Sequence, residues 1–138
     1  MVGGIKKKIH VIFKTAIIAS LLLCSINVFA VNRYWVATTA GNWNNTANWS
    51  NSTGGAGDYS VPASGDNVVF NSSGNGDCTI DMTVVDLIRL SVVNGYTGTI
   101  DLAGYDVTVA ASTSSPVFAT GTINDSEGTG QLSITTTG

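Results

Sequence analysis

The sequence predicts an all-β fold, a short parallel β-solenoid (β-helix) with a tryptophan-rich cap at its N-terminal end. Thr79-Ile80-Asp81 recurs as Thr99-Ile100-Asp101 and, slightly altered, as Thr122-Ile123-Asn124, at intervals of 20 and then 23 residues. Self-similarity at this period is typical of solenoids, in which each repeat buries its apolar face by stacking on its neighbours. Apolar and polar residues alternate around each copy, which is a strand pattern. The alternative is an antiparallel β-sandwich, because the spacing of strands and turns also permits that fold.

Residues 1–30 predict a signal peptide. A basic leader with four lysines precedes an apolar stretch at 15–26, and Val28-Phe29-Ala30 offers a cleavage site after Ala30. The apolar run is shorter than the roughly 20 residues that a membrane-spanning helix needs. We therefore expect a secreted or cell-surface protein that meets the membrane only through its signal peptide during export. A retained anchor and lipidation at Cys24 are the alternatives.

Removal of this segment changes the composition of the chain. All lysines and the single histidine, His10, leave with it, and two arginines remain beside nine acidic residues, a formal charge of about −7. A net negative charge disfavours nucleic-acid binding, because that function needs a basic surface. Histidine-dependent triads and lysine chemistry are excluded, so we expect no enzyme, cofactor or metal site. Cys78 is then the single cysteine, which excludes a disulfide framework and predicts a small buried apolar residue.

Residues 31–61 hold all three tryptophans, in Tyr34-Trp35-Val36, Gly41-Asn42-Trp43 and Asn48-Trp49-Ser50. The first coil of a solenoid exposes unpaired backbone groups and needs a cap. We expect the indoles to supply that cap, with Trp35 in the core. The other interpretation is a carbohydrate-binding site in which Trp43 and Trp49 stack on sugar rings and Asn42 and Asn48 bind hydroxyl groups.

Residues 62–138 predict the solenoid coils. We expect strands at 67–70, 78–84, 87–93, 98–102, 106–110, 117–124 and 131–135. Turn signals such as Asn94-Gly95 and Ala103-Gly104 separate them. Each repeat has room for two strands and a third short one at a bend. The C-terminal end shows no cap, so we expect either a fragment of a longer solenoid or self-association through the open C-terminal coil.

The aspartates suggest two further sites. Asp81 and Asp101 share a repeat position, which would hold their carboxylates about 5 Å apart on adjacent coils, near the separation found in retaining glycosidases. A polysaccharide-cleaving enzyme is therefore a less favoured alternative to a solvated structural ladder. Asp77, Asp81 and Asp86 carry oxygen ligands of the kind calcium prefers, but turn-forming residues explain this loop without a metal.

The tryptophan motifs and the segment from Pro62 through Gly65-Asp66 to Phe70 carry a resemblance across about residues 33–109. They resemble the N-terminal region of large exported bacterial surface proteins with β-helical, autotransporter-passenger-like or adhesin-like bodies. The resemblance implies a surface-exposed structural or adhesive role. It carries over no catalytic residues. Cell-surface or extracellular glycans are the partners that the carbohydrate-binding interpretation of the tryptophans predicts.

Overall fold

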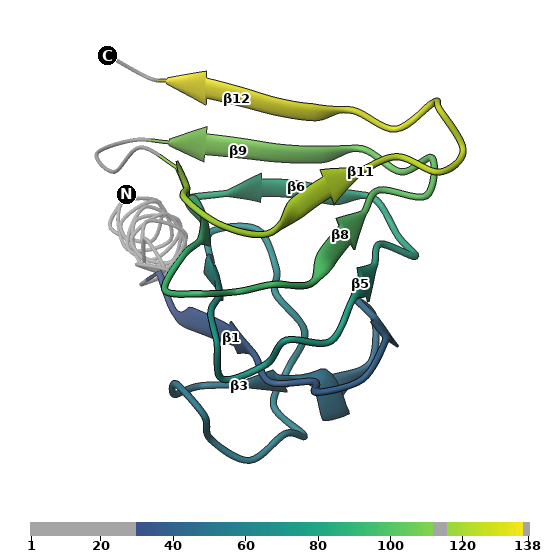
Figure 1. Cartoon of the computed structure of the whole chain (residues 1–138). Coiled ribbons are helices and arrows are strands. Elements are labelled where there is room, and N and C mark those ends of the chain that lie inside the picture. The colour runs from purple at the N-terminus through teal and green to yellow at the C-terminus, as the bar shows by residue number, and fades with distance from the viewer. Residues whose placement is uncertain (1–29, 112–115, 137–138) are drawn as a thin grey trace, which may run out of the picture.

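The computed structural model describes residues 30–111 and 116–136, and the fold in this part of the chain is all-β. Its helical content is one 3₁₀ turn, η1 (Thr46–Asn48). The predicted signal peptide lies outside the described residues, except for Ala30. The strands form three sheets stacked around one core, with β1 and β3 at one end and β12 at the other (Figure 1).

Each sheet is built from strands that lie far apart in the chain. The first has the order β10 (Val117–Phe118), β7 (Arg89–Val92), β4 (Asn67–Phe70), β1 (Asn32–Trp35) and β3 (Trp49–Ser50). The second has the order β11 (Thr122–Asn124), β8 (Thr99–Asp101), β5 (Cys78–Thr79) and β2 (Gly41–Asn42). The third has the order β12 (Leu132–Thr136), β9 (Val107–Ala111) and β6 (Val84–Leu87).

The strand pairs are parallel, with the exception of the antiparallel β1–β3 pair. From β4 onward the chain visits the first, second and third sheets in turn and then returns to the first. Each strand thus pairs with the strand three places later, as β4 pairs with β7 and β5 with β8. This pairing does not fit the antiparallel β-sandwich that the sequence also permitted.

The register between neighbouring strands corrects the predicted repeat. Cys78 pairs with Ile100 and Thr79 with Asp101, an offset of 22 residues, so the 20-residue alignment of Ile80 with Ile100 was wrong. The sheet formed by β4 and β7 has the same 22-residue offset. A slip of two residues keeps every side chain on its own face, because the strand period is two. The apolar pattern therefore could not distinguish the two registers. The next offset, 23 residues between β8 and β11, matches the prediction.

Several predicted strands divide at the corners between sheets. The segment 67–70 forms β4 as predicted, whereas 78–84 ends after Thr79 and resumes as β6, and 117–124 splits into β10 and β11. Gly121 lies at that second corner with a φ of +76°, a conformation that glycine adopts without a steric penalty. The turn at Asn94-Gly95 is confirmed, since both residues have positive φ.

The core runs through the centre of the three sheets. Its buried apolar side chains include Phe70, Ile80, Leu87, Val92, Ile100 and Val109. Cys78 is fully buried as predicted, and this burial, followed by the charge of Asp81, raises the pKa of its thiol. A protonated, inaccessible thiol is a packing group and not a nucleophile.

Candidate functional surfaces

The three tryptophans form one packed cluster at the end of the fold that carries β1 and β3. The ring centroids of Trp35 and Trp49 lie 5.2 Å apart at 73°, and those of Trp43 and Trp49 lie 4.7 Å apart at 70°. Phe70 on β4 extends the cluster, with its ring centroid 5.8 Å from that of Trp49. Edge-to-face packing of this kind stabilises aromatic clusters beyond the area that they bury.

Two of the indole N–H groups have backbone partners inside the fold. Trp35 Nε1 donates to the carbonyl of Gly76 at 2.9 Å, and Trp49 Nε1 donates to the carbonyl of Trp43 at 2.7 Å. The cluster is therefore held both by packing and by hydrogen bonds that fix the ring orientations.

The exposed position that the carbohydrate-binding interpretation gave to Trp43 and Trp49 was wrong. Their exposed fractions are 1% and 0%, and that of Trp35 is 0%, which confirms Trp35 as core. No indole face is free to stack on a sugar ring, because all three pack against one another and against Phe70. This burial is what the cap interpretation requires.

The two asparagines predicted to bind hydroxyl groups lie beside the cluster. Asn42 is exposed on β2, while Asn48 is half-buried and its side-chain amide donates to the carbonyl of Asn42 at 2.9 Å. Gly41 leaves room for this contact, because a Cβ there would overlap the Asn48 side chain. Asn48 thus closes the turn between β2 and β3, and only Asn42 faces solvent fully.

The predicted aspartate pair does not form. Asp101 lies beside Thr79 in the sheet, and Asp81 lies two residues further along, past the end of β5. The carboxylates also point to different partners: Asp81 Oδ1 accepts from the Asn44 backbone N–H at 2.8 Å, and Asp101 Oδ1 accepts from that of Ser126 at 2.8 Å. The stacked pair on which carboxylate catalysis depended was therefore a wrong prediction.

Other acidic and polar side chains make the same kind of contact between segments that lie 21–25 residues apart in the chain. Each accepts a hydrogen bond from a backbone N–H of the other segment, at 2.7–3.0 Å in the pairs Asp77–Thr99, Asn75–Thr97, Asp125–Gly104 and Asp106–Gln131. The described residues contain no group of three or more acidic, cysteine or histidine side chains able to hold a metal ion. The acidic side chains thus satisfy backbone donors at the corners, where the sheet ladders are interrupted.

Asp101 gives this network a pH dependence that can be measured. Hydrogen bonds from the Ser126 backbone, the Ser126 side chain and the Ala103 backbone lower the pKa of its carboxyl. The folded-state pKa of Asp101 lies below the unfolded value of about 3.9. The stabilisation of the folded protein by the Asp101 carboxylate is therefore complete above the unfolded pKa and is lost as the pH falls through the folded-state pKa. We expect Asp101→Ala to destabilise the fold at neutral pH, and the difference from wild type to shrink in acid.

Urea unfolding of both proteins between about pH 6 and about pH 2.5 measures this difference on both sides of the unfolded carboxyl pKa. Glu127→Ala is the matched control, because it removes one exposed negative charge from the turn between β11 and β12. A difference between wild type and Asp101→Ala that stays constant across this range would contradict the role of the carboxylate.

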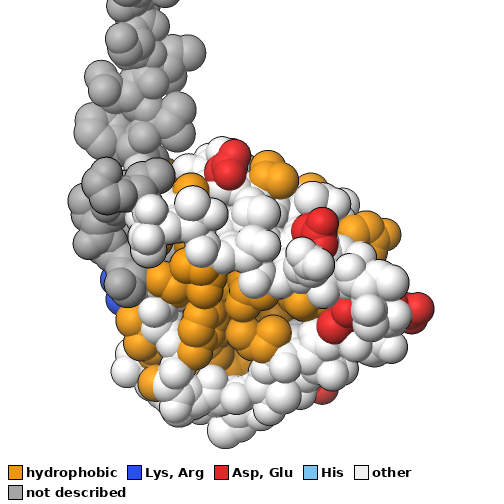
Figure 2. Space-filling view, turned by 90° about the horizontal axis from the view of Figure 1, so that it is seen from above, with side chains coloured by type: hydrophobic (Ala, Val, Ile, Leu, Met, Phe, Trp, Pro, Cys, Tyr) orange, Lys and Arg blue, Asp and Glu red, His pale blue; other side chains and the backbone are white. Residues whose placement is uncertain are grey.

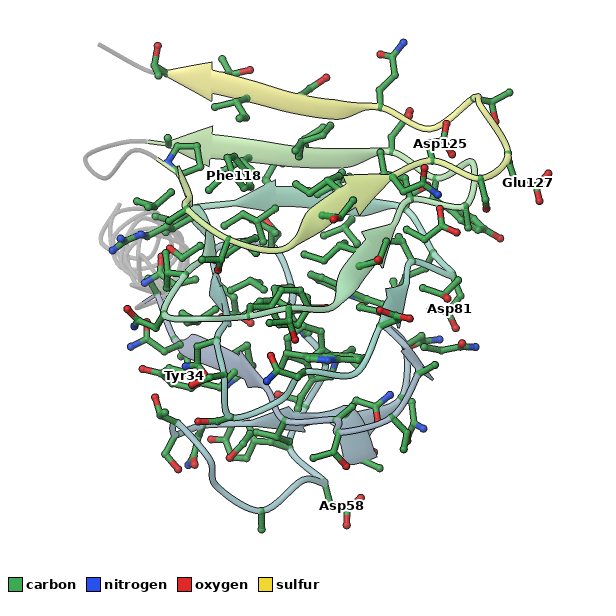
Figure 3. All side chains as sticks on the ribbon, in the orientation of Figure 1. Tyr34, Asp58, Asp81, Phe118, Asp125 and Glu127 are labelled. Carbon is green, nitrogen blue, oxygen red and sulfur yellow. The ribbon has the colours of Figure 1, made fainter. Side chains whose placement is uncertain are left out.

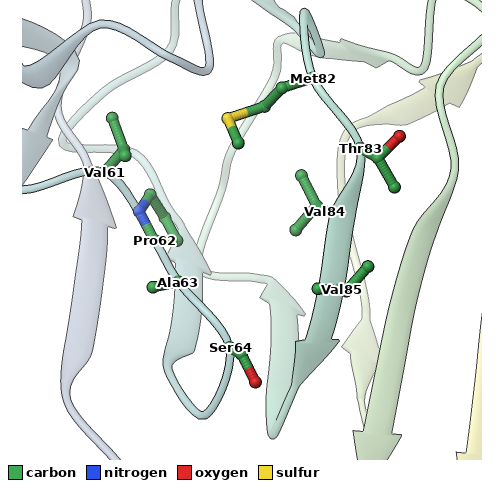
Figure 4. A pocket seen from close by; sticks show the side chains of 8 residues that line it. All are labelled: Val61, Pro62, Ala63, Ser64, Met82, Thr83, Val84 and Val85. Carbon is green, nitrogen blue, oxygen red and sulfur yellow. The ribbon is translucent and has the colours of Figure 1, made fainter.

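A small cavity opens between the segment 61–64 and the start of β6 (Figure 4). Its volume is about 270 Å³, and it is lined by Val61, Pro62, Ala63, Ser64, Met82, Thr83, Val84 and Val85. The lining carries two hydroxyl groups and no ionisable side chain, so it offers neither an acid nor a base to a substrate. The sequence contained no signal for it, since its two walls come from separate segments.

The end of the fold opposite the tryptophans is open. Figure 2 shows it from above as an apolar area bordered by polar side chains. We call it the open end and define it by the inward-facing side chains of β10, β11 and β12, which are Phe118, Ile123, Leu132 and Ile134. Phe118, Ile123 and Ile134 are among the exposed large hydrophobic residues of the described chain.

No family model, curated protein or solved structure matches this chain. Within residues 30–111 and 116–136, no helix has the length and apolar character needed to cross a lipid bilayer.

Proposed function

We propose that this chain is a β-solenoid segment of an exported bacterial surface or extracellular protein, with a structural or adhesive, non-catalytic role. The observation that supports the proposal is the parallel pairing of each strand from β4 to β9 with the strand three places later, with the tryptophan cluster packed at one end of the core. Repeats of this kind contact only their neighbours and build extended, stiff bodies. A closed first coil protects such a body from pairing with other sheets at that end.

The arrangement of polar groups supports a structural role over a catalytic one. The acidic side chains that could serve in catalysis accept backbone hydrogen bonds at the corners of the coils. Asp81 and Asp101 are out of register, so the geometry does not favour the polysaccharide-cleaving alternative. The acidic character of the chain also argues against a nucleic-acid partner.

A carbohydrate-binding module built on Trp43 and Trp49 is disfavoured by the burial of both rings. If extracellular glycans are the partners of an adhesive role, they would contact the outward faces of the coils, where Asn42 and exposed threonines lie. Contacts of this type are hydrogen bonds to hydroxyl groups without aromatic stacking.

We expect the tryptophan emission of the native protein to be blue-shifted, and to stay unchanged when soluble polysaccharides are added. The physical reason is that all three indoles are removed from water and from any ligand. A fluorescence titration with a panel of polysaccharides measures this, with the urea-unfolded protein as the reference for exposed indoles. Saturable quenching or a spectral shift with one glycan class would overturn the structural interpretation and favour a binding module.

The export part of the proposal has its own test. The protein is expressed with its N-terminal segment in a bacterial host, and the N-terminus of the product recovered outside the cytoplasm is sequenced. A product beginning at Val31 supports export with cleavage after Ala30. An intact leader on cytoplasmic protein would contradict it.

A further inference from the structure

Asparagine followed by glycine is a chemically reactive pair, and the chain contains two such pairs, Asn75-Gly76 and Asn94-Gly95. The backbone nitrogen of the glycine attacks the side-chain carbonyl carbon of the asparagine, because a glycine has no Cβ to obstruct the approach. A C–N bond forms, and the side-chain nitrogen leaves as ammonia with the glycine N–H proton. Water then opens the resulting succinimide ring to aspartate or isoaspartate. In sum, an amide and water become a carboxylate and ammonium.

The second pair lies in an accessible turn between β7 and β8. Asn94 and Gly95 are exposed and have φ values of 53° and 79°, as in a type I′ turn. The Tyr96 N–H donates to the Val93 carbonyl, and the Ser72 N–H donates to the Asn94 carbonyl. Both bonds are 3.3 Å long, where about 2.9–3.0 Å is usual. In the described part of the chain, neither the Asn94 side chain nor the Gly95 N–H has a hydrogen-bond partner within the protein.

The first pair is held by the surrounding structure. The Asn75 side-chain amide donates to the Ser72 carbonyl at 3.3 Å, and its oxygen accepts from the Thr97 N–H at 3.0 Å. Gly76 is buried, and its N–H donates to the Ala37 carbonyl at 2.8 Å. The attacking nitrogen and the amide that it would attack are therefore both fixed by other contacts.

From this contrast we infer that Asn94 is a site of spontaneous deamidation in the folded protein, and that the fold protects Asn75. Reaction at Asn75 requires the loss of its two side-chain hydrogen bonds and of the bond from the buried Gly76 N–H. Reaction at Asn94 requires that an exposed turn opens. Because each lost hydrogen bond adds to the activation free energy, we expect the native protein to react at least about tenfold faster at Asn94 than at Asn75. This chemistry does not depend on the structural or adhesive role proposed above.

Deamidation at position 94 adds one negative charge at the corner that precedes β8. Figure 3 shows Asp81, Asp125 and Glu127 projecting from the opposite corner, beyond the ends of β5 and β11. The new carboxylate does not crowd these three groups, so we expect the modified chain to stay folded. The product should separate from the amide form on anion exchange as a more acidic species.

Peptide mass mapping of the full chain, recovered after export, measures the reaction. The folded protein is incubated at mildly alkaline pH in water enriched in the heavy oxygen isotope, and samples are digested over time. We expect the isotope to enter the peptide that contains Asn94, while the peptide that contains Asn75 keeps its amide. The same chain unfolded in urea is the reference. Both pairs should react at similar rates there, because the protecting contacts are gone.

Gly95→Ala tests the attacking residue. An added Cβ would lie 3.7 Å from the Ser72 Cβ, an ordinary contact, and it would hinder the backbone nitrogen beside it. We expect this variant to lose most of the isotope uptake at Asn94. Gly128→Ala is the matched control, because it places an alanine at a similar positive φ of +72° but follows Glu127 and not an asparagine. Circular dichroism confirms that each variant is folded.

Three outcomes overturn the inference. They are a native Asn94 that keeps its amide while the unfolded chain loses both, equal native rates at the two pairs, and a folded Gly95→Ala that takes up the isotope as wild type does. In each case a native β-sheet circular dichroism spectrum would leave the proposed architecture standing. A wild-type protein without β-structure would instead contradict that architecture. If Gly95→Ala fails to fold, the comparison of the two pairs in native and unfolded wild type decides.

Discussion

Replacing Trp49 by alanine is expected to lower the free energy of unfolding by about 3–5 kcal/mol, the range for truncating a buried aromatic side chain. Trp49 is fully buried and packs edge-to-face on both other indoles. Its removal would leave a cavity and would orphan the Trp43 carbonyl that accepts its N–H. Since domains of this size are stable by about 5–15 kcal/mol, the variant should be close to unfolding.

Urea unfolding followed by circular dichroism measures this loss, and Tyr105→Ala provides the matched control. Tyr105 is 42% exposed, so its truncation should cost about 1 kcal/mol or less. Equal effects of the two substitutions would contradict the view that the tryptophan cluster closes the end of the fold. A Trp49→Ala variant with wild-type stability would contradict it more strongly.

Gly76→Ala is expected to destabilise the protein by about 3 kcal/mol or more, because it forces backbone apart and weakens buried hydrogen bonds. A Cβ at Gly76 would overlap the backbone carbonyl of Thr39, which cannot rotate away as a side chain would. The Gly76 carbonyl also accepts from Trp35 Nε1 at 2.9 Å and from the Tyr96 hydroxyl at 3.0 Å. Any shift of this backbone disturbs both contacts.

Gly128→Ala is the control for this substitution. Gly128 has a φ of +72°, and an added Cβ would meet no atom within 4 Å, so its replacement tests backbone conformation alone. We expect a cost of about 1–2 kcal/mol there, the penalty for an alanine in the left-handed region. The urea midpoints of the two variants compare the costs, and a larger loss at Gly128 than at Gly76 would refute the steric argument.

The sequence predicted the parts of the fold that depend on local chemistry. Alternating apolar residues indicated the strand at 67–70, and Asn94-Gly95 indicated a turn, which has positive φ at both residues. The burial of Cys78 and Trp35 also followed from their places in alternating runs. These predictions held because side-chain direction along a strand is set by the backbone period of two.

The candidate sites were harder to predict because they depend on distant segments. Trp43 and Trp49 lie among asparagines and glycines, a composition typical of exposed loops, yet both are buried and pack against each other and against Phe70. Asp81 and Asp101 share a sequence motif but not a position in the sheet. The cavity beside β6 carries no local signal at all.

By itself, therefore, the sequence determined the all-β class, the inward and outward faces of the strands, and the acidic character of the chain. The tertiary structure alone decided the 22-residue register between β5 and β8, and with it which carboxylates meet which backbone donors. The physical reason is that apolar alternation is unchanged by a two-residue slip. Register is then chosen by packing and hydrogen bonds between paired strands and their flanking turns, and these form only when residues about 22 apart are brought together.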